Sequence, residues 1–204
     1  MVVLGLVASC YPDIDRDVTD FDIVGTNYDP SKNFDDYTTF FIPDSIIIVF
    51  DSTKPSPDYP EDEATVIIDG IRNNLISLGW TEMLPADTVG GNIPDVYIRT
   101  LVWTSDVSGV VYYGGYYGGW YGGYYPGYPY YGGGASYYSY TTGTVLIDMI
   151  DLVHPDHVNE SLDIIWTAGL NGLVTSSGGS SSGLSRIEFS INQAFSQSNY
   201  LKKN

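Results

Sequence analysis

The chain has 204 residues, of which 25 are acidic and 8 are basic, and its formal net charge is −17. A surface this acidic repels nucleic acid and anionic lipid headgroups, so neither is expected as a partner. The length suits a single domain, and no stretch after the first residues approaches the roughly 18 consecutive apolar residues of a membrane-spanning helix.

The amino terminus carries the only cysteine, Cys10, after an apolar run that begins at Met1. The residues Val7-Ala8-Ser9-Cys10 resemble the lipobox of bacterial lipoproteins. This resemblance implies that residues 1–9 are removed as a signal peptide and that the Cys10 thiol receives a diacylglycerol, with palmitate as the expected acyl chain. A secretory signal normally starts with basic residues, and none precedes Arg16, so we expect this signal to be truncated.

Residues 10–20 predict an acidic tether, because "YPDIDRDVTD" has four Asp and too little apolar surface to offset the entropy of ordering. An acidic run after the cysteine also resembles the surface-export signal of Bacteroidetes lipoproteins. We therefore expect an outer-membrane lipoprotein on the periplasmic or the cell-surface face. The alternative is a buried strand, "VVLGLVA", followed by a free core thiol at Cys10.

The first predicted strands cover residues 21–29 and 37–43, which are rich in aromatic and β-branched residues. The turn cluster "PSKNFDD" separates them. Residues 45–50 either extend the second strand beyond Pro43 or form another strand.

Two helices are predicted by apolar residues that recur at the spacing of one helical face. The first covers residues 61–78 and stops at Gly79, a residue type that commonly ends helices. The second covers residues 184–198 and follows a Gly/Ser linker at 175–183.

Three later strands are predicted over residues 95–107, 143–153 and 161–174, where alternate side chains share a face. Hairpin connections would make most of the sheet antiparallel, and the two helices would cover one of its faces. The predicted class is α+β. We expect a single domain over residues 21–200, with a long Tyr/Gly-rich loop inserted between two strands.

This loop, the Tyr/Gly tract at residues 112–140, holds 13 of the 19 tyrosines and ten of the 23 glycines. Tyrosine has an apolar face, a polar tip and little rotamer entropy to lose, so it is typical of adaptable binding surfaces. We expect an exposed tract that binds a protein or glycan ligand, or further copies of this chain. The alternative is a low-complexity loop without a specific ligand. The candidate ligand-binding residues are Tyr116, Tyr117, Trp120, Tyr121, Tyr124, Tyr125 and Tyr128.

Both histidines, His154 and His157, lie in "HPDHVNE" with Asp156 and Glu160. Two His and a carboxylate suit zinc, which makes these residues weak metal candidates. Pro, Asp and Asn are also typical of a hairpin turn, so the alternative interpretation of this segment is a turn without a metal. We therefore expect no metal and no cofactor.

Other polar residues give no catalytic pattern. Asp148 and Asp151 are carboxylates that could pair, whereas Asp95, Arg99 and Arg72 are expected to form ion pairs rather than to catalyse. G-x-S-x-G, P-loop, dinucleotide-binding and H-E-x-x-H motifs are all missing from the sequence. The leading hypothesis is therefore a non-enzymatic envelope protein. The alternatives are a metal-dependent or carboxylate acid-base hydrolase and a structural subunit of a surface fibre or layer.

Several segments, in this order and spacing, resemble the family called domain of unknown function 4136, a family of bacterial lipoproteins. They are "YDPSKNFDDYTTFFIP", "LISLGW", "PDVYIRTLVW", a Gly/aromatic tract, "YTTGTVLIDMID" and "LDIIWTAGLNG", and together they span roughly residues 20–198. The resemblance implies an envelope location and an α+β fold, but no activity and no catalytic residues. This chain departs from the family pattern in its extreme tyrosine content.

Overall fold

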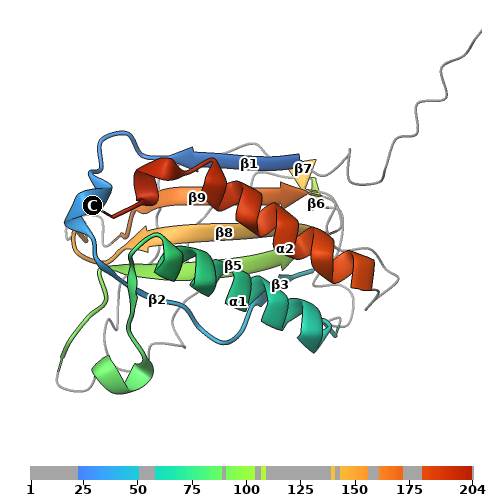
Figure 1. Cartoon of the computed structure of the whole chain (residues 1–204), viewed down its shortest axis with the longest axis horizontal. Coiled ribbons are helices and arrows are strands. Elements are labelled where there is room, and N and C mark those ends of the chain that lie inside the picture. The colour runs from blue at the N-terminus through green and yellow to red at the C-terminus, as the bar shows by residue number, and fades with distance from the viewer. Residues whose placement is uncertain are drawn as a thin grey trace, which may run out of the picture.

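Two layers make up the described part of the chain, a mixed β-sheet and a pair of helices on one of its faces (Figure 1). The computed structural model describes residues 23–50, 58–88, 91–103, 107–108, 139–140, 143–155, 161–171 and 181–203. The helices are α1 (Glu61–Ser77) and α2 (Ser181–Ser196), with short 3-10 turns at Phe34–Asp36, Pro85–Thr88 and Asn199–Leu201. The strands of the main sheet are β1 (Ile23–Tyr28), β2 (Thr39–Phe41), β3 (Ile47–Val49), β4 (Thr81–Glu82), β5 (Val96–Trp103), β8 (Thr144–Asp151) and β9 (Ile164–Asn171).

The sheet has the strand order β1-β9-β8-β5-β2-β4, and β3 also pairs with β5. From β1 to β5 all pairings are antiparallel, and hairpins join β5 to β8 and β8 to β9, whereas β1 and β9 lie far apart in the chain. At the other edge β2 and β3 both run parallel to β5, and β4 runs parallel to β2. The helix α1 explains this difference, because it carries the chain back along the sheet before β4 and β5 begin. The α+β class is thus confirmed, and the sheet is mixed.

Alternation along β8 separates its two faces. Val145, Ile147 and Met149 point toward the helices and are fully buried. The face away from the helices carries a second, smaller buried cluster around Trp103 and Leu146. All eight residues of β8 are buried, which makes it a central strand that contributes to both faces.

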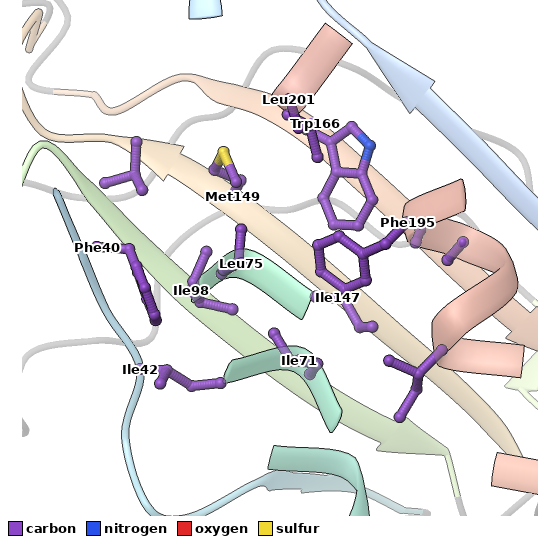
Figure 2. Close-up of a cluster of buried hydrophobic side chains, with 14 of the residues drawn as sticks. Phe40, Ile42, Ile71, Leu75, Ile98, Ile147, Met149, Trp166, Phe195 and Leu201 are labelled. Atoms are coloured by element: carbon purple, nitrogen blue, oxygen red, sulfur yellow. The ribbon is translucent and has the colours of Figure 1, made fainter. Parts of the chain in front are cut away.

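The main core lies between the sheet and the apolar faces of α1 and α2, whose spacing in the sequence predicted the two helices (Figure 2). Ile71 and Leu75 on α1 are fully buried, and Phe195 on α2 packs on Trp166 of β9 with 5.3 Å between ring centroids. Each such side chain contributes about 1.5–3 kcal/mol on burial. None of the helices in the described ranges is long and apolar enough to span a membrane.

The two helices approach each other closely at Gly70. A Cβ atom placed there would lie 3.2 Å from Ile191 Cδ1, so a larger residue would require the Ile191 side chain to shift by a few tenths of an ångström. One turn further on, the side-chain amide of Asn74 donates to Asn192 Oδ1 at 2.7 Å.

The predicted helix stop at Gly79 is also where the C-terminal residues join the fold. Gly79 has φ +94°, which favours glycine, and a Cβ there would lie 2.9 Å from Lys203 Cβ. The amide N of Lys203 donates to the Leu78 carbonyl at 2.8 Å, and Trp80 Nε1 donates to the Leu201 carbonyl at 2.8 Å. These bonds hold the chain end against the end of α1.

Candidate functional site

The strands β5 and β8, which precede and follow the Tyr/Gly tract in the sequence, pair with each other in a continuous antiparallel ladder. Their register runs from Val96 opposite Asp151 to Trp103 opposite Thr144 without a shift. At its end, the amide N of Gly143 donates to the Trp103 carbonyl at 2.8 Å. The chain therefore leaves the sheet and returns to it at directly adjacent positions.

A second ladder continues this hairpin. It joins β6 (Val107–Ser108) to β7 (Ser139–Tyr140), with Val107 opposite Tyr140 and Ser108 opposite Ser139. Residues 109–138 thus begin and end at a paired position. The seven candidate ligand-binding aromatic residues fall within 109–138, outside the described residues.

Several titratable groups of the described part of the chain meet around Asp151, at the end of β8. One carboxylate oxygen, Oδ2, accepts hydrogen bonds from Lys32 Nζ at 2.9 Å and from the Tyr37 hydroxyl at 2.8 Å. The other, Oδ1, accepts from the backbone N–H groups of Val153 at 2.8 Å and His154 at 3.0 Å. Lys32 also lies 3.1 Å from Asp163. We call Lys32, Tyr37, Asp151, His154 and Asp163 the Asp151 cluster.

Burial and hydrogen bonding have opposite effects on the pKa of Asp151 and on that of Lys32. Burial, the largest effect, would raise the pKa of Asp151, but the hydrogen bonds from Lys32, Tyr37 and His154 hold it below its ordinary value. Burial would likewise lower the pKa of Lys32, but its carboxylate partners raise it. Burial and then the Asp151 hydrogen bond raise the pKa of Tyr37. At neutral pH the cluster therefore holds a carboxylate, an ammonium and a neutral phenol.

His154 is the member of the Asp151 cluster that faces water. Its Nδ1 lies 3.0 Å from Asp151 Oδ2, and 57% of its side chain is exposed. A carboxylate only accepts hydrogen bonds, so Nδ1 carries the proton in this contact. The other ring nitrogen, Nε2, takes no part in it. A carboxylate and the histidine that it orients are two of the three members of a hydrolytic triad. No described Ser, Thr or Cys hydroxyl or thiol hydrogen-bonds this histidine to complete one.

The metal hypothesis for "HPDHVNE" finds no support in the described part of the chain. There, no group of three or more His, Cys, Asp or Glu side chains is arranged to hold a metal ion. His154 turns to Asp151 instead, while Asp156, His157 and Glu160 lie outside the described residues.

Asp148 and Asp151, which the sequence left as carboxylates that could pair, do not pair, because they lie on opposite faces of the sheet. They are three positions apart on one strand, and successive strand residues alternate between faces. Asp148 instead forms a buried ion pair with Arg99, directly opposite on β5, and accepts from the Thr167 hydroxyl on β9 at 2.8 Å. Arg99 Nε donates to Asp148 Oδ2 at 2.9 Å.

The other expected ion pairs are confirmed for Arg72 and not for Asp95. Arg72 pairs with Asp44, Asp69 and Glu82 at 2.6–2.8 Å. The Asp95 carboxylate accepts from the backbone N–H groups of Thr38 and Thr39 at 2.7 and 2.8 Å, and so fixes the chain at the start of β2.

Lys32 and Tyr37 are site residues that sequence reasoning missed. Both belong to the segment "PSKNFDDYTT", whose pattern indicates only a turn and the start of a strand. Their partner Asp151 lies more than a hundred positions away, and no local pattern reports a contact at that distance. The one signal in the sequence is Lys32 itself, because basic residues are uncommon in this very acidic chain.

These features define a two-layer α+β domain that carries a long insertion on a closed hairpin. The chain belongs to the family described as "Domain of unknown function (DUF4136)", whose model matches residues 24–198. No curated protein matches the chain.

Among solved structures, the chain is similar to a DUF4136 family protein from Bacteroides thetaiotaomicron. The two share 27% sequence identity with a TM-score of 0.64, over 90% of this chain and 98% of that protein. A more distant likeness is to the PelC dodecamer from Paraburkholderia phytofirmans, with 13% identity and a TM-score of 0.40 over 90% of this chain and 99% of that one. At that score, the assembly of PelC says nothing about this chain.

Proposed function

We propose that this chain is a lipid-anchored, non-enzymatic protein of the bacterial outer membrane that presents its Tyr/Gly tract to a ligand. The anchor would be Cys10, because Val7-Ala8-Ser9 before it has the small residues of a lipobox. The observation that carries the presenting role is the closed hairpin at the base of the tract.

The closed hairpin separates folding from presentation. Between Val96 and Trp103, β5 pairs with β8 at every position. The described residues by themselves supply a large core between the sheet and the helices. A tract attached in this way can contact a ligand without rearranging the sheet that carries it.

The chemistry of the tract indicates the class of ligand. No charged side chain occurs between Val107 and Ile147, in a chain whose net charge is −17. Tyrosine and tryptophan rings stack on flat, weakly polar surfaces such as sugar rings, and their polar tips add hydrogen bonds. We therefore favour an uncharged glycan or an extended peptide as the ligand.

The non-enzymatic part of the proposal is supported by the partners of the buried ionisable groups. Asp148 is bound by Arg99 and Thr167, and Asp151 by Lys32 and Tyr37. Each of these bonds ties one structural element to another. A hydrolase needs such groups to converge on a substrate instead.

The presenting role can be tested by removing residues 109–138 and joining Ser108 to Ser139 through Asn-Gly, a two-residue turn that suits a hairpin. We expect the melting temperature to stay within a few degrees, because a shorter loop loses less entropy on closure. Retention on whole cells or on a glycan array should be lost. The matched control keeps the length of the segment and replaces each Tyr and Trp by Ser.

Either of two results would overturn the presenting role. If the deletion unfolds the domain, the aromatic residues belong to its core. If both variants bind as the full chain does, the tract is a passive loop.

Anchoring needs its own experiment, which is mass analysis of the chain extracted from the membranes of a bacterial host. We expect loss of residues 1–9 and a diacylglycerol on Cys10, and we expect Cys10→Ser to release the chain from the membrane. A mature chain that retains Met1, or an unmodified Cys10 thiol, would contradict the proposed anchor.

A further inference from the structure

The two edges of the sheet differ in how well they are protected against pairing with another strand. At one edge the outer strands are short, since β4 has two residues and β3 has three, and Pro43 interrupts the chain after β2. Short strands and proline are the usual means by which proteins block an exposed edge. At the other edge β1 has six residues, "IVGTNY", with no charge and no proline. No described strand pairs with its outer side.

The register of β1 against β9 shows which backbone groups point outward. The amide N of Asp29 donates to the Ile165 carbonyl at 3.0 Å, and Tyr28 lies opposite Trp166. In an antiparallel ladder, hydrogen-bonded and non-bonded positions alternate. Asn27 and Gly25 therefore bond to β9. The residues that direct both N–H and C=O away from the sheet are Val24, Thr26 and Tyr28.

These three residues form a self-complementary set. A two-fold axis through Thr26 would place Thr26 opposite its own copy and Val24 opposite Tyr28 of the other copy. Each of the three pairs exchanges two hydrogen bonds. Thr–Thr pairs and aromatic pairs with β-branched residues are favourable cross-strand neighbours. All three side chains are at least partly exposed on the helix face, and 42% of Tyr28 is exposed, so a second copy would cover apolar surface that is now wet.

We infer that β1 pairs antiparallel with β1 of a second copy of this chain, which joins two sheets into one across a two-fold axis at Thr26. The charge of the molecule favours this edge over others for self-pairing. Two copies with a net charge of −17 repel each other, and β1 is an uncharged strand whose pairing opposes no acid to an acid. Isologous contacts of this kind are the commonest route to homodimers.

This inference is independent of the proposed presenting role, because β1 and the hairpin of β5 and β8 contribute different residues. The dimer should therefore persist when residues 109–138 are replaced by Asn-Gly. Loss of ligand binding with an intact dimer, or the reverse, identifies which of the two ideas has failed.

A single engineered cysteine tests the register. In the full chain carrying Cys10→Ser, we expect Thr26→Cys to form an intermolecular disulfide under mild oxidation. Residues in a hydrogen-bonded antiparallel pair have Cα atoms about 5.5 Å apart, within the range of about 4.4–6.8 Å that disulfides allow. The matched control is Asn27→Cys on the same strand, which would lie opposite Gly25 of the other copy and should not cross-link. Thr65→Cys on the exposed surface of α1 is a second control.

Charge substitution tests the same contact by equilibrium sedimentation. We expect Thr26→Lys to raise the dimer dissociation constant at least about tenfold, because identical charges then face each other at the axis. Thr26→Glu should do the same, and an equimolar mixture of the two variants should dimerise again as a heterodimer. Thr65→Lys adds the same charge elsewhere and should leave the dimer unchanged. Circular dichroism confirms that each variant is folded.

Several results would overturn the inference. One is a full chain that stays monomeric at every concentration, whether or not it captures an extended peptide on β1. Others are a dimer that Thr26→Lys does not weaken and equal cross-linking by Thr26→Cys and Asn27→Cys. If the charged variants do not fold, the cysteine comparison alone decides, because Thr26→Cys changes little in volume or charge.

Discussion

Asp148 and Asp151 are both fully buried on β8, yet they stabilise different parts of the molecule. Asp148 lies within the strand, and its partners Arg99 and Thr167 are directly opposite on the neighbouring strands. Asp151 ends the strand, and its partners Lys32 and Tyr37 belong to the segment after β1. The same residue type therefore joins strand to strand on one face and holds a loop against the sheet on the other.

The largest effect should come from breaking the ion pair inside the sheet. We expect Arg99→Met to lower the free energy of unfolding by about 3–5 kcal/mol, because it leaves the fully buried Asp148 carboxylate without its cation. Urea unfolding measures this. Replacing Asp148 by Leu in the same molecule should restore most of the loss. The matched control is Arg72→Met. Two of its three partners, Asp44 and Asp69, are exposed and only Glu82 is largely buried, so the loss should be smaller, about 1–2 kcal/mol. An equal loss for both arginines would remove the distinction between the fully buried pair and the partly exposed one.

A smaller loss is expected when the loop anchor is removed. Asp151→Ala leaves the Tyr37 hydroxyl and two backbone N–H groups without their acceptor, which should cost about 2–3 kcal/mol. Lys32 loses less, because it keeps Asp163 at 3.1 Å. Hydrogen exchange would show whether the effect is local. We expect faster exchange at Asp29 and Tyr37 and unchanged protection in β8 and β9. Uniformly faster exchange would mean that Asp151 supports the sheet as Asp148 does.

The two acids can also be compared through pH. The pKa of Asp151 is held below its ordinary value, so its stabilising contribution is complete above about pH 4 and is lost as pH falls through the lower folded pKa. Asp151→Asn should therefore flatten the decline in stability below pH 4. Asp29 and Asp95, whose pKa values are also lowered, should account for the remaining decline in stability at low pH. An unchanged acid profile would show that the pKa of Asp151 is the same in the folded and the unfolded chain, which would contradict the lowered value.

The smallest effect should follow loss of the exposed histidine. His154→Ala removes the ring contact with Asp151 but keeps the backbone N–H that also bonds this carboxylate. We expect a loss of about 0.5 kcal/mol, or roughly 1–2 °C in melting temperature for a domain of this size. Calorimetry measures it. A loss as large as that of Asp151→Ala would make His154 a structural member of the Asp151 cluster.

Sequence patterns were sufficient where a residue's neighbours along the chain determine its structure. The helical spacing that includes Ile71 and Leu75 predicted α1, and alternation predicted which β8 residues share a face of the sheet. The parallel pairing of β2 and β3 with β5 was not anticipated, although a strand, a helix and a strand in succession already favour it. The contacts of Asp151 with Lys32 and Tyr37 could not be predicted, because these residues are more than a hundred positions away from it in the sequence.

The hydrogen bond from Gly143 to the Trp103 carbonyl affects how far members of this family can diverge. A hairpin closed at its base places little limit on the length of the inserted segment, since each doubling of a loop costs only about 0.6 kcal/mol of closure entropy. We therefore expect insertions, deletions and changes of composition at residues 109–138 to be nearly neutral for folding and open to selection for other purposes. The same property makes this hairpin a natural grafting position, where a foreign peptide could replace the native segment on an unchanged scaffold.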